Sequence, residues 1–254
     1  KTLADAKRLA AGGAQALAGG QTLIASMKQR LLRPENLVDL GGVAELRGIK
    51  VEGQNVVIGA MTRHQDVAAS ADVRKHIPAL AALAEGIGDR QVRAMGTMGG
   101  SVANNDPAAC YPSAVLGLGA TVVTDRREIA ADDFFQGLYT TALEPGELIT
   151  AIRFPIPAKA AYAKFRQPAS RFALVGVFVA QTGGGVRVAI TGTGNGVFRH
   201  KGLEAALARS FTPDAVKGVA IDASDISGDL HASAAYRAHL VTVQTQAAVR
   251  QANG

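Results

Sequence analysis

Two short glycine-containing segments carry the residue types that bind phosphate groups. Residues 18–22 read Ala-Gly-Gly-Gln-Thr, and residues 97–101 read Thr-Met-Gly-Gly-Ser. In each segment a glycine pair follows an apolar residue, and a hydroxyl side chain comes soon after it. Glycine tolerates positive φ and lets backbone N–H groups approach a ligand without an intervening Cβ. We therefore predict that each segment binds anionic oxygens and that the two together suit a diphosphate.

A glycine pair alone is weak evidence, because tight turns without any ligand use the same residues. The pair Gly12-Gly13 has the same appearance but precedes no predicted helix start. The first segment differs, because residues 16–18 are predicted as a strand and Thr22 as the start of a helix. This order places the free N–H groups of a helix N-terminus behind the glycines, where they favour a phosphate.

The composition excludes several other classes of function. The chain has 254 residues, 48% of them hydrophobic, which is enough to bury an ordinary core. Its single cysteine, Cys110, excludes an internal disulfide framework, a cysteine-ligated iron–sulfur cluster and a Cys-rich zinc site on this chain. The five histidines are dispersed, so no metal site is expected. No motif for hydrolysis or phosphoryl transfer is present, so these reactions have no support.

Charge and hydropathy exclude further classes of function. The net charge is +6, but Lys and Arg are scattered and aromatic residues make up only 5%, so nucleic-acid binding is not expected. No apolar run reaches the roughly 20 residues of a membrane span, so we predict a cytoplasmic protein. The sequence begins at Lys1 rather than at a methionine, so a short segment could precede it in the protein.

The elements that must position the two segments form two predicted units. Residues 1–53 read as a small α/β unit, with helices over 3–9 and from Thr22 through Leu31 to a stop at Pro34, and strands over 16–18, 37–40 and 49–51. Residues 54–155 read as a mixed sheet with helices, with strands over 56–59, 120–124, 128–131 and 148–154 and helices over 78–87 and 113–118.

The proline-rich stretch at 154–159, Phe-Pro-Ile-Pro-Ala-Lys, predicts a boundary, because alternating prolines stiffen a connector. Residues 156–254 then read as an antiparallel sheet followed by helices. The predicted strands cover 161–166, 172–181 and 186–191, with the glycines at 183–185 as a hairpin turn, and the predicted helices cover 201–208, 212–221 and 233–252. The fold class is therefore α+β.

The residues around the glycine segments resemble one family. Residues 23–28 and 102–107 extend the two segments, and residues 88–93 and 144–153 match the same pattern. Together they resemble the FAD-binding medium subunit of the molybdenum hydroxylases, which include aerobic carbon monoxide dehydrogenase and the xanthine dehydrogenases. The branch that resembles carbon monoxide dehydrogenase fits best, and the resemblance covers nearly the whole chain. It implies an FAD-binding domain of the PCMH type over 1–155 and a carbon monoxide dehydrogenase flavoprotein domain over 156–254.

The resemblance also implies which residues contact FAD. The first segment would wrap the pyrophosphate, the second would supply further N–H and hydroxyl donors, and the flavin ring would lie where the last strand of the FAD domain meets the C-terminal domain. The candidate cofactor-binding residues are Ala18, Gly19, Gly20, Gln21, Thr22, Leu23, Thr97, Met98, Gly99, Gly100, Ser101, Asn104, Asp106, Ile149, Lys164 and Phe172.

Some of these residues keep an alternative reading. Phe172 could cover one face of the flavin and Lys164 could favour negative charge on the reduced ring, or both could serve ordinary packing and solvation. Asn104 could equally cap a turn. Where relatives carry the last aspartate of an Asp-Pro-x-x-Asp pattern, this chain has Cys110, which puts the expected adenosine contact in doubt. Cys110 is more simply a small buried hydrophobic residue, whereas Asp106 keeps the first acidic position.

The function that the resemblance implies is electron transfer. FAD on this chain would take electrons from iron–sulfur clusters of a small partner subunit, and a large partner subunit would hold the molybdenum cofactor and oxidise the substrate. The expected assembly is a dimer of heterotrimers, and the electron acceptor and the substrate remain open. Two alternatives are a stand-alone flavin oxidoreductase and a nucleotide-binding module without redox chemistry. No catalytic acid or base is required of this chain.

Overall fold

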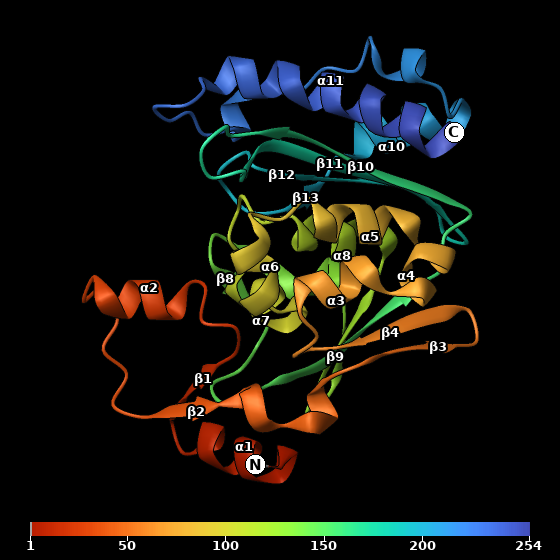
Figure 1. The fold of residues 1–254 in the computed structure, drawn as a ribbon. Helices are drawn as coiled ribbons and strands as arrows, with labels where there is room; N and C mark the ends of the chain where they lie inside the picture. Colours follow the sequence, from red (N-terminus) through yellow and green to blue (C-terminus); the bar gives the residue numbers. More distant parts are fainter. Residues whose placement is uncertain (1) are drawn as a thin grey trace.

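A computed structural model describes residues 2–254 of the chain, as three layers stacked from the N-terminus to the C-terminus (Figure 1). The small N-terminal unit lies at one end, a five-stranded sheet covered by helices lies in the middle, and a four-stranded sheet under a long helix lies at the other end (Figure 1). Among these residues no helix is long and apolar enough to span a membrane. The fold is α+β, as predicted.

The N-terminal unit holds a two-stranded parallel sheet, formed by β1 (Gln15–Leu17) and β2 (Leu37–Asp39). Helix α1 (Leu3–Ala11) packs its small residues against this sheet and begins at Thr2, whose hydroxyl accepts from the Asp5 N–H. The short helix α2 (Leu23–Lys28) lies between the two strands in sequence but apart from the rest of the unit in space (Figure 1). None of its residues is buried.

The middle layer is an antiparallel sheet in the order β3-β4-β9-β5-β6. Its strands are β3 (Ile49–Glu52), β4 (Asn55–Gly59), β9 (Ile149–Pro155), β5 (Thr121–Thr124) and β6 (Glu128–Ala130). The segment between β4 and β5 supplies the helices of this layer, which are α3 (His64–Ala69), α4 (Ala71–His76), α5 (Pro78–Glu85), α6 (Arg90–Met95), α7 (Met98–Asn104) and α8 (Tyr111–Leu118). After β6 come α9 (Ala131–Phe134) and a small hairpin of β7 (Phe135–Gly137) and β8 (Thr140–Thr141).

The third layer is an antiparallel sheet in the order β10-β11-β12-β13. Its strands are β10 (Lys159–Arg166), β11 (Ala173–Thr182), β12 (Gly185–Thr191) and β13 (Phe198–Arg199). Helices α10 (Lys201–Arg209) and α11 (Ala234–Asn253) cover its outer face.

Helix α8 joins the middle and third layers, because all of its residues are buried. Phe178 of β11 belongs to the same hydrophobic core as α8, and a Cβ added at Gly117 would lie 2.8 Å from the Phe178 ring. Strand β11 is buried along most of its length, since Val177 and Val179 face α11 while Phe178 faces α8. A strand buried on both faces explains the nearly continuous apolar run in this part of the sequence.

Most predicted elements are confirmed within two or three residues, and three differ. The helix starting after Thr22 ends at Lys28 rather than running on through Leu31, whose side chain is 72% exposed and finds no core to cover. The predicted helix at 212–221 is only a short 3₁₀ turn, Pro213–Val216. Strand β3 pairs with β4 and so belongs to the five-stranded sheet, although the sequence placed it in the small unit.

Candidate functional site

One cavity of about 640 Å³ lies where the three layers meet. Its walls come from the loop after β1, the start of α7, the stretch 141–149 before and into β9, and the stretch 164–172 around the end of β10. These are the regions that the sequence selected. Every predicted cofactor-binding residue lines this cavity except Met98, whose side chain is fully buried in the core.

The first glycine segment is an open loop with unused donors. Within residues 2–254, the consecutive backbone N–H groups of residues 19–23 have no acceptor. The Thr22 hydroxyl makes no cap bond with α2, and Gly20 has φ +72°, a conformation that favours glycine. A Cβ at Gly19 would lie 2.2 Å from the Met95 carbonyl oxygen at the end of α6, so only glycine fits there. The loop therefore offers a row of donors to a ligand in the cavity.

The second glycine segment is not a turn but the first turn of α7. The N–H groups of Met98 and Gly99 donate to the carbonyls of Thr62 and Ala60, at 3.0 Å and 2.8 Å, and the Gly100 N–H donates to the Thr97 hydroxyl at 3.2 Å. The prediction that these N–H groups are free for a phosphate is therefore wrong.

Close packing, rather than positive φ, explains the glycines of the second segment. A Cβ at Gly99 would lie 2.6 Å from the Ala60 Cβ, and one at Gly100 would lie 3.3 Å from the Ala18 Cβ. The second contact shows that the two segments lie side by side. The second segment can still offer a ligand the Ser101 hydroxyl, and the Asn104 side chain follows one turn later. Neither side chain has a partner among residues 2–254.

Asp106 is partly committed to its own loop. One carboxylate oxygen accepts from the Ala108 N–H at 2.8 Å, and the other accepts from the Tyr139 hydroxyl at 3.4 Å. The first bond closes a tight turn after α7. Asp106 therefore shapes the cavity wall as well as facing it.

Lys164 and Cys110 meet in the wall of the cavity. The Lys164 ammonium donates to the carbonyls of Gly86 and Arg171, at 2.9 Å and 3.0 Å, and lies 3.3 Å from the Cys110 sulfur. These contacts fix the charge of Lys164 in place. Cys110 is buried, as predicted, but it accepts from an ammonium group rather than packing only against apolar atoms. Phe172 lies nearby at the cavity mouth and is 49% exposed.

His64 also lines the cavity, and sequence reasoning missed it. Its side chain is buried, its backbone N–H donates to the Gly96 carbonyl, and its ring packs edge-on against Tyr111. Burial, helped by the charge of Arg93, lowers the pKa of His64 to about 4, so the ring is neutral at pH 7. Metal-ligand spacing gives no signal for His64, because no group of His, Cys, Asp and Glu suited to a metal exists in the described part of the chain.

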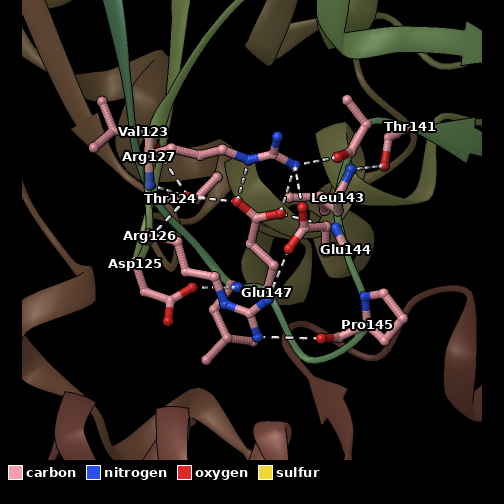
Figure 2. A network of polar contacts seen from close by, with 12 residues as sticks. Val123, Thr124, Asp125, Arg126, Arg127, Thr141, Leu143, Glu144, Pro145 and Glu147 are labelled. Atoms are coloured by element: carbon pink, nitrogen blue, oxygen red, sulfur yellow. Dashed lines mark hydrogen bonds and ion pairs between the residues drawn. The ribbon is translucent and has the colours of Figure 1, made fainter.

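Glu147 is the second residue that sequence reasoning missed as part of the site. It lines the cavity and lies in a network of charged side chains between β5 and β9 (Figure 2). Burial would raise the pKa of Glu147, but hydrogen bonds from Arg127, the Glu144 N–H and Thr124 outweigh it and hold the pKa at about 2.

The cavity fits a dinucleotide cofactor. Its volume lies in the range of small-molecule sites, and one wall carries unused backbone donors at a place where a Cβ would intrude. Diphosphate oxygens need such donors, and neutral N–H and hydroxyl groups can satisfy them without a bound cation.

Comparison with known proteins agrees with this geometry. Residues 1–157 match the family described as the FAD binding domain in molybdopterin dehydrogenase. The chain is 37% identical over 240 residues to the carbon monoxide dehydrogenase medium chain of Hydrogenophaga pseudoflava, covering 88% of this chain and 84% of that one. It is 34% identical over 250 residues to the glyceraldehyde dehydrogenase medium chain of Sulfolobus acidocaldarius, covering 92% and 89%.

Solved structures give the same result. A crystal structure of the Cu,Mo-CO dehydrogenase in its cyanide-inactivated form superposes with a TM-score of 0.91 at 34% identity, over 99% of this chain and 95% of that one. Quinoline 2-oxidoreductase from Pseudomonas putida 86 superposes with a TM-score of 0.88 at 27% identity, over 99% and 94%. The chain therefore belongs to the FAD-binding medium subunits of the molybdenum hydroxylases, in the branch that resembles carbon monoxide dehydrogenase.

Proposed function

We propose that this chain binds FAD in the cavity and carries electrons between a partner subunit and an external acceptor. The observation that carries the proposal is the row of unused N–H groups at residues 19–23, which faces a cavity of about 640 Å³ within the matched FAD domain. A row of fixed donors binds a diphosphate at little cost in ordering, because the loop already holds them in place.

The residues of this chain bind and orient the cofactor. The first segment and the Thr22 hydroxyl would hold the pyrophosphate, and the Ser101 hydroxyl would add a donor from the second segment. Ile149, Lys164 and Phe172 would surround the flavin end, where the fixed ammonium of Lys164 favours negative charge. FAD, when bound, supplies the redox chemistry by accepting and releasing electrons, and the protein supplies position and electrostatics.

Partner subunits are the second part of the proposal. The relatives are medium chains of larger enzymes, and one structural relative is a Cu,Mo enzyme. We infer a large subunit that holds the molybdenum cofactor, a small subunit with iron–sulfur clusters, and an assembly that is a dimer of heterotrimers in the cytoplasm. Co-expression of this chain with its genomic neighbours, followed by size-exclusion chromatography, tests the assembly. Elution of this chain alone would contradict it.

The visible absorption spectrum of the purified chain tests the cofactor. We expect flavin bands, and we expect acid to release a compound that co-elutes with FAD on chromatography. A colourless chain that stays colourless after incubation with FAD contradicts the proposal. A chain that binds ADP as tightly as FAD would indicate nucleotide binding without redox chemistry. Turnover of a small substrate by the isolated chain would indicate a stand-alone oxidoreductase instead.

Electron transfer needs its own test in the assembled complex. With the complex kept free of oxygen, reducing substrate should bleach the flavin bands, and added acceptor should restore them. Flavin that stays oxidised while the iron–sulfur signals become reduced would contradict the proposed route through this chain.

A further inference from the structure

We propose that Arg127 is a positioning residue, which holds the 141–149 wall of the cavity and thereby orients the flavin end of bound FAD. The inference rests on the proposed function, because it assigns a role in binding FAD. Arg127 lies at the turn between β5 and β6 and does not itself line the cavity. Its effect must therefore pass through the wall residues that it contacts.

One guanidinium bridges two parts of this wall (Figure 2). Arg127 Nε donates to Glu147 Oε1 at 3.0 Å, and Arg127 Nη2 donates to Glu147 Oε2 at 3.0 Å. The same Nη2 donates to the Ala142 carbonyl at 2.7 Å. Ala142 lies between the cavity-lining residues Thr141 and Leu143. A paired fork of this kind fixes geometry as well as charge.

The Glu147 end of the bridge is enclosed. The side chain is 0% exposed, and its carboxylate also accepts from the Thr124 hydroxyl at 2.7 Å and from the Glu144 N–H at 2.8 Å. Glu147 is followed by Leu148 and Ile149, which line the cavity as well. The Arg127 and Thr124 donors therefore tie Glu147 to the β5–β6 turn, and the Glu144 N–H holds it within the wall.

The chain just before Glu147 has little freedom to move. The Glu147 N–H donates to the Glu144 carbonyl at 2.9 Å across Pro145 and Gly146, and Gly146 has φ +72°. Pro and Gly at these positions form a tight turn. A Cβ at Gly146 would lie 2.7 Å from the Ala10 carbonyl, so the turn also abuts the end of α1. A stiff turn transmits a displacement at Glu147 to the cavity wall.

Loss of Arg127 would leave the Glu147 carboxylate unpaired in the wall. The Glu147 carboxylate is buried whereas the Arg127 side chain is 43% exposed, and removing the partner of a buried charge is costly because that charge is left uncompensated. A negative charge at the wall would also oppose the negative charge that reduction adds to a bound flavin, so the flavin midpoint potential should fall. Neutralising Glu147 instead would leave Arg127 with the Glu144 carboxylate, 3.7 Å from its Nη2, and the loss of one negative charge at the wall should raise the potential.

The chain offers a matched control in a second arginine–glutamate fork on the same sheet. Arg153 Nη1 and Nη2 donate to the two carboxylate oxygens of Glu128, at 2.9 Å and 2.6 Å, and neither residue lines the cavity. Breaking this fork removes an exposed pair with the same chemistry.

The experiment compares the full-length chain with the variants Arg127→Met, Arg127→Lys, Glu147→Gln and Arg153→Met. Titration of each FAD-free protein gives the Kd for FAD, and dye-equilibrated reduction gives the flavin midpoint potential. For Arg127→Met we expect the Kd to rise about tenfold or more and the potential to fall. For Arg127→Lys we expect recovery of most of both effects, and for Arg153→Met a Kd within about twofold of the parent.

Two results would overturn the inference while leaving the proposed function intact. The first is a parent chain that binds FAD and an Arg127→Met variant that matches Arg153→Met in both measurements. The second is a shift of the potential in the same direction in Arg127→Met and Glu147→Gln, which would indicate packing alone. If Arg127→Met fails to fold, Glu147→Gln decides, and an unchanged potential overturns the inference. A parent chain that binds no FAD is a failure of the proposed function itself.

Discussion

Residues 18–22 and residues 97–101 apart from Met98 line the same cavity, and the two segments lie side by side, but they use their backbone donors differently. In the first segment the N–H groups are unused, and Gly20 adopts positive φ. In the second, the N–H groups of residues 98–100 are bonded within the chain, and its glycines have no positive φ. The first segment turns unused backbone donors to the cavity, whereas the second is a support on which the first one rests.

The difference shows that a glycine can be required for two unrelated reasons. Gly20 serves the conformation of a loop, while Gly99 serves the close approach of α7 to Ala60. Substitutions in the two segments should therefore fail in different assays. Glycine substitutions in the first segment should weaken FAD binding, and glycine substitutions in the second should weaken the fold.

The largest effect is expected from Gly99→Val. The new Cβ would lie 2.6 Å from Ala60 inside the core, and overpacking of this kind should lower the free energy of unfolding by about 3 kcal/mol. Urea unfolding of the FAD-free protein measures it. Gly183→Val is the control, because no atom lies within 4 Å of that Cβ position. If the stability is unchanged but FAD binding is lost, the second segment is a binding loop, and the proposed difference between the two segments is wrong.

Lowering the pH should destabilise the fold by protonating His64. Its pKa is about 4 when folded and near 6.5 when unfolded, so the neutral ring stabilises the fold above pH 6.5 and this stability is lost as pH falls towards 4. One such group should cost about 2 kcal/mol between about pH 6 and pH 4.5. Unfolding measured at several pH values tests this, with His64→Phe, which should flatten the dependence over that window. An equal slope in both proteins would rule out His64 as its source.

Gly19→Ala should have the next largest effect, and on binding rather than on stability. Its Cβ would meet the Met95 carbonyl, so the exposed loop must move and its donors would lose their alignment. We expect the Kd for FAD to rise about tenfold with little change in unfolding free energy. Gly218→Ala is the matched control, since neither Gly19 nor Gly218 has positive φ, the Gly218 Cβ position is open, and Gly218 lies outside the cavity. If Gly19→Ala lowered the stability and left the Kd unchanged, the first segment would be a structural support like the second.

The smallest effects should separate two hydroxyl groups of the second segment. Ser101→Ala removes a hydroxyl without a protein partner and should raise the Kd for FAD about fivefold. Thr97→Ala removes the cap on the Gly100 N–H and should cost about 1 kcal/mol of unfolding free energy instead. Calorimetric titration with FAD and thermal unfolding of both variants measure the two effects. If Ser101→Ala lowered the stability and Thr97→Ala raised the Kd instead, the assignment of Ser101 to FAD binding and of Thr97 to the fold would be contradicted.

The fold was largely predictable because its core strands have simple patterns. Strands such as β4, β9, β11 and β12 are apolar runs bounded by turn residues. Helices α3, α4 and α6 escaped prediction because each is a single short stretch with mixed polarity, stabilised by tertiary contacts. The same limit applies to residues 212–221, where helical spacing exists but most of the segment stays irregular.

The site was predictable in place but not in detail. The resemblance selected residues that the structure gathers around one cavity, from Gly19 to Phe172. It could not show which N–H groups are free, because that depends on Thr62 and Ala60, which lie far from residues 98–100 in sequence. It also could not identify Glu147, whose importance arises from partners more than twenty residues away, such as Thr124.

Helix α8 has a consequence for how the molecule unfolds. Both sheets pack on it, and Gly117 allows its contact with Phe178 from beyond the proline-rich connector. Neither sheet can then expose its inner face without exposing the helix shared with the other. The segments before and after residue 156 should melt as one cooperative unit, with a single calorimetric transition and similar hydrogen-exchange protection in β9 and β11.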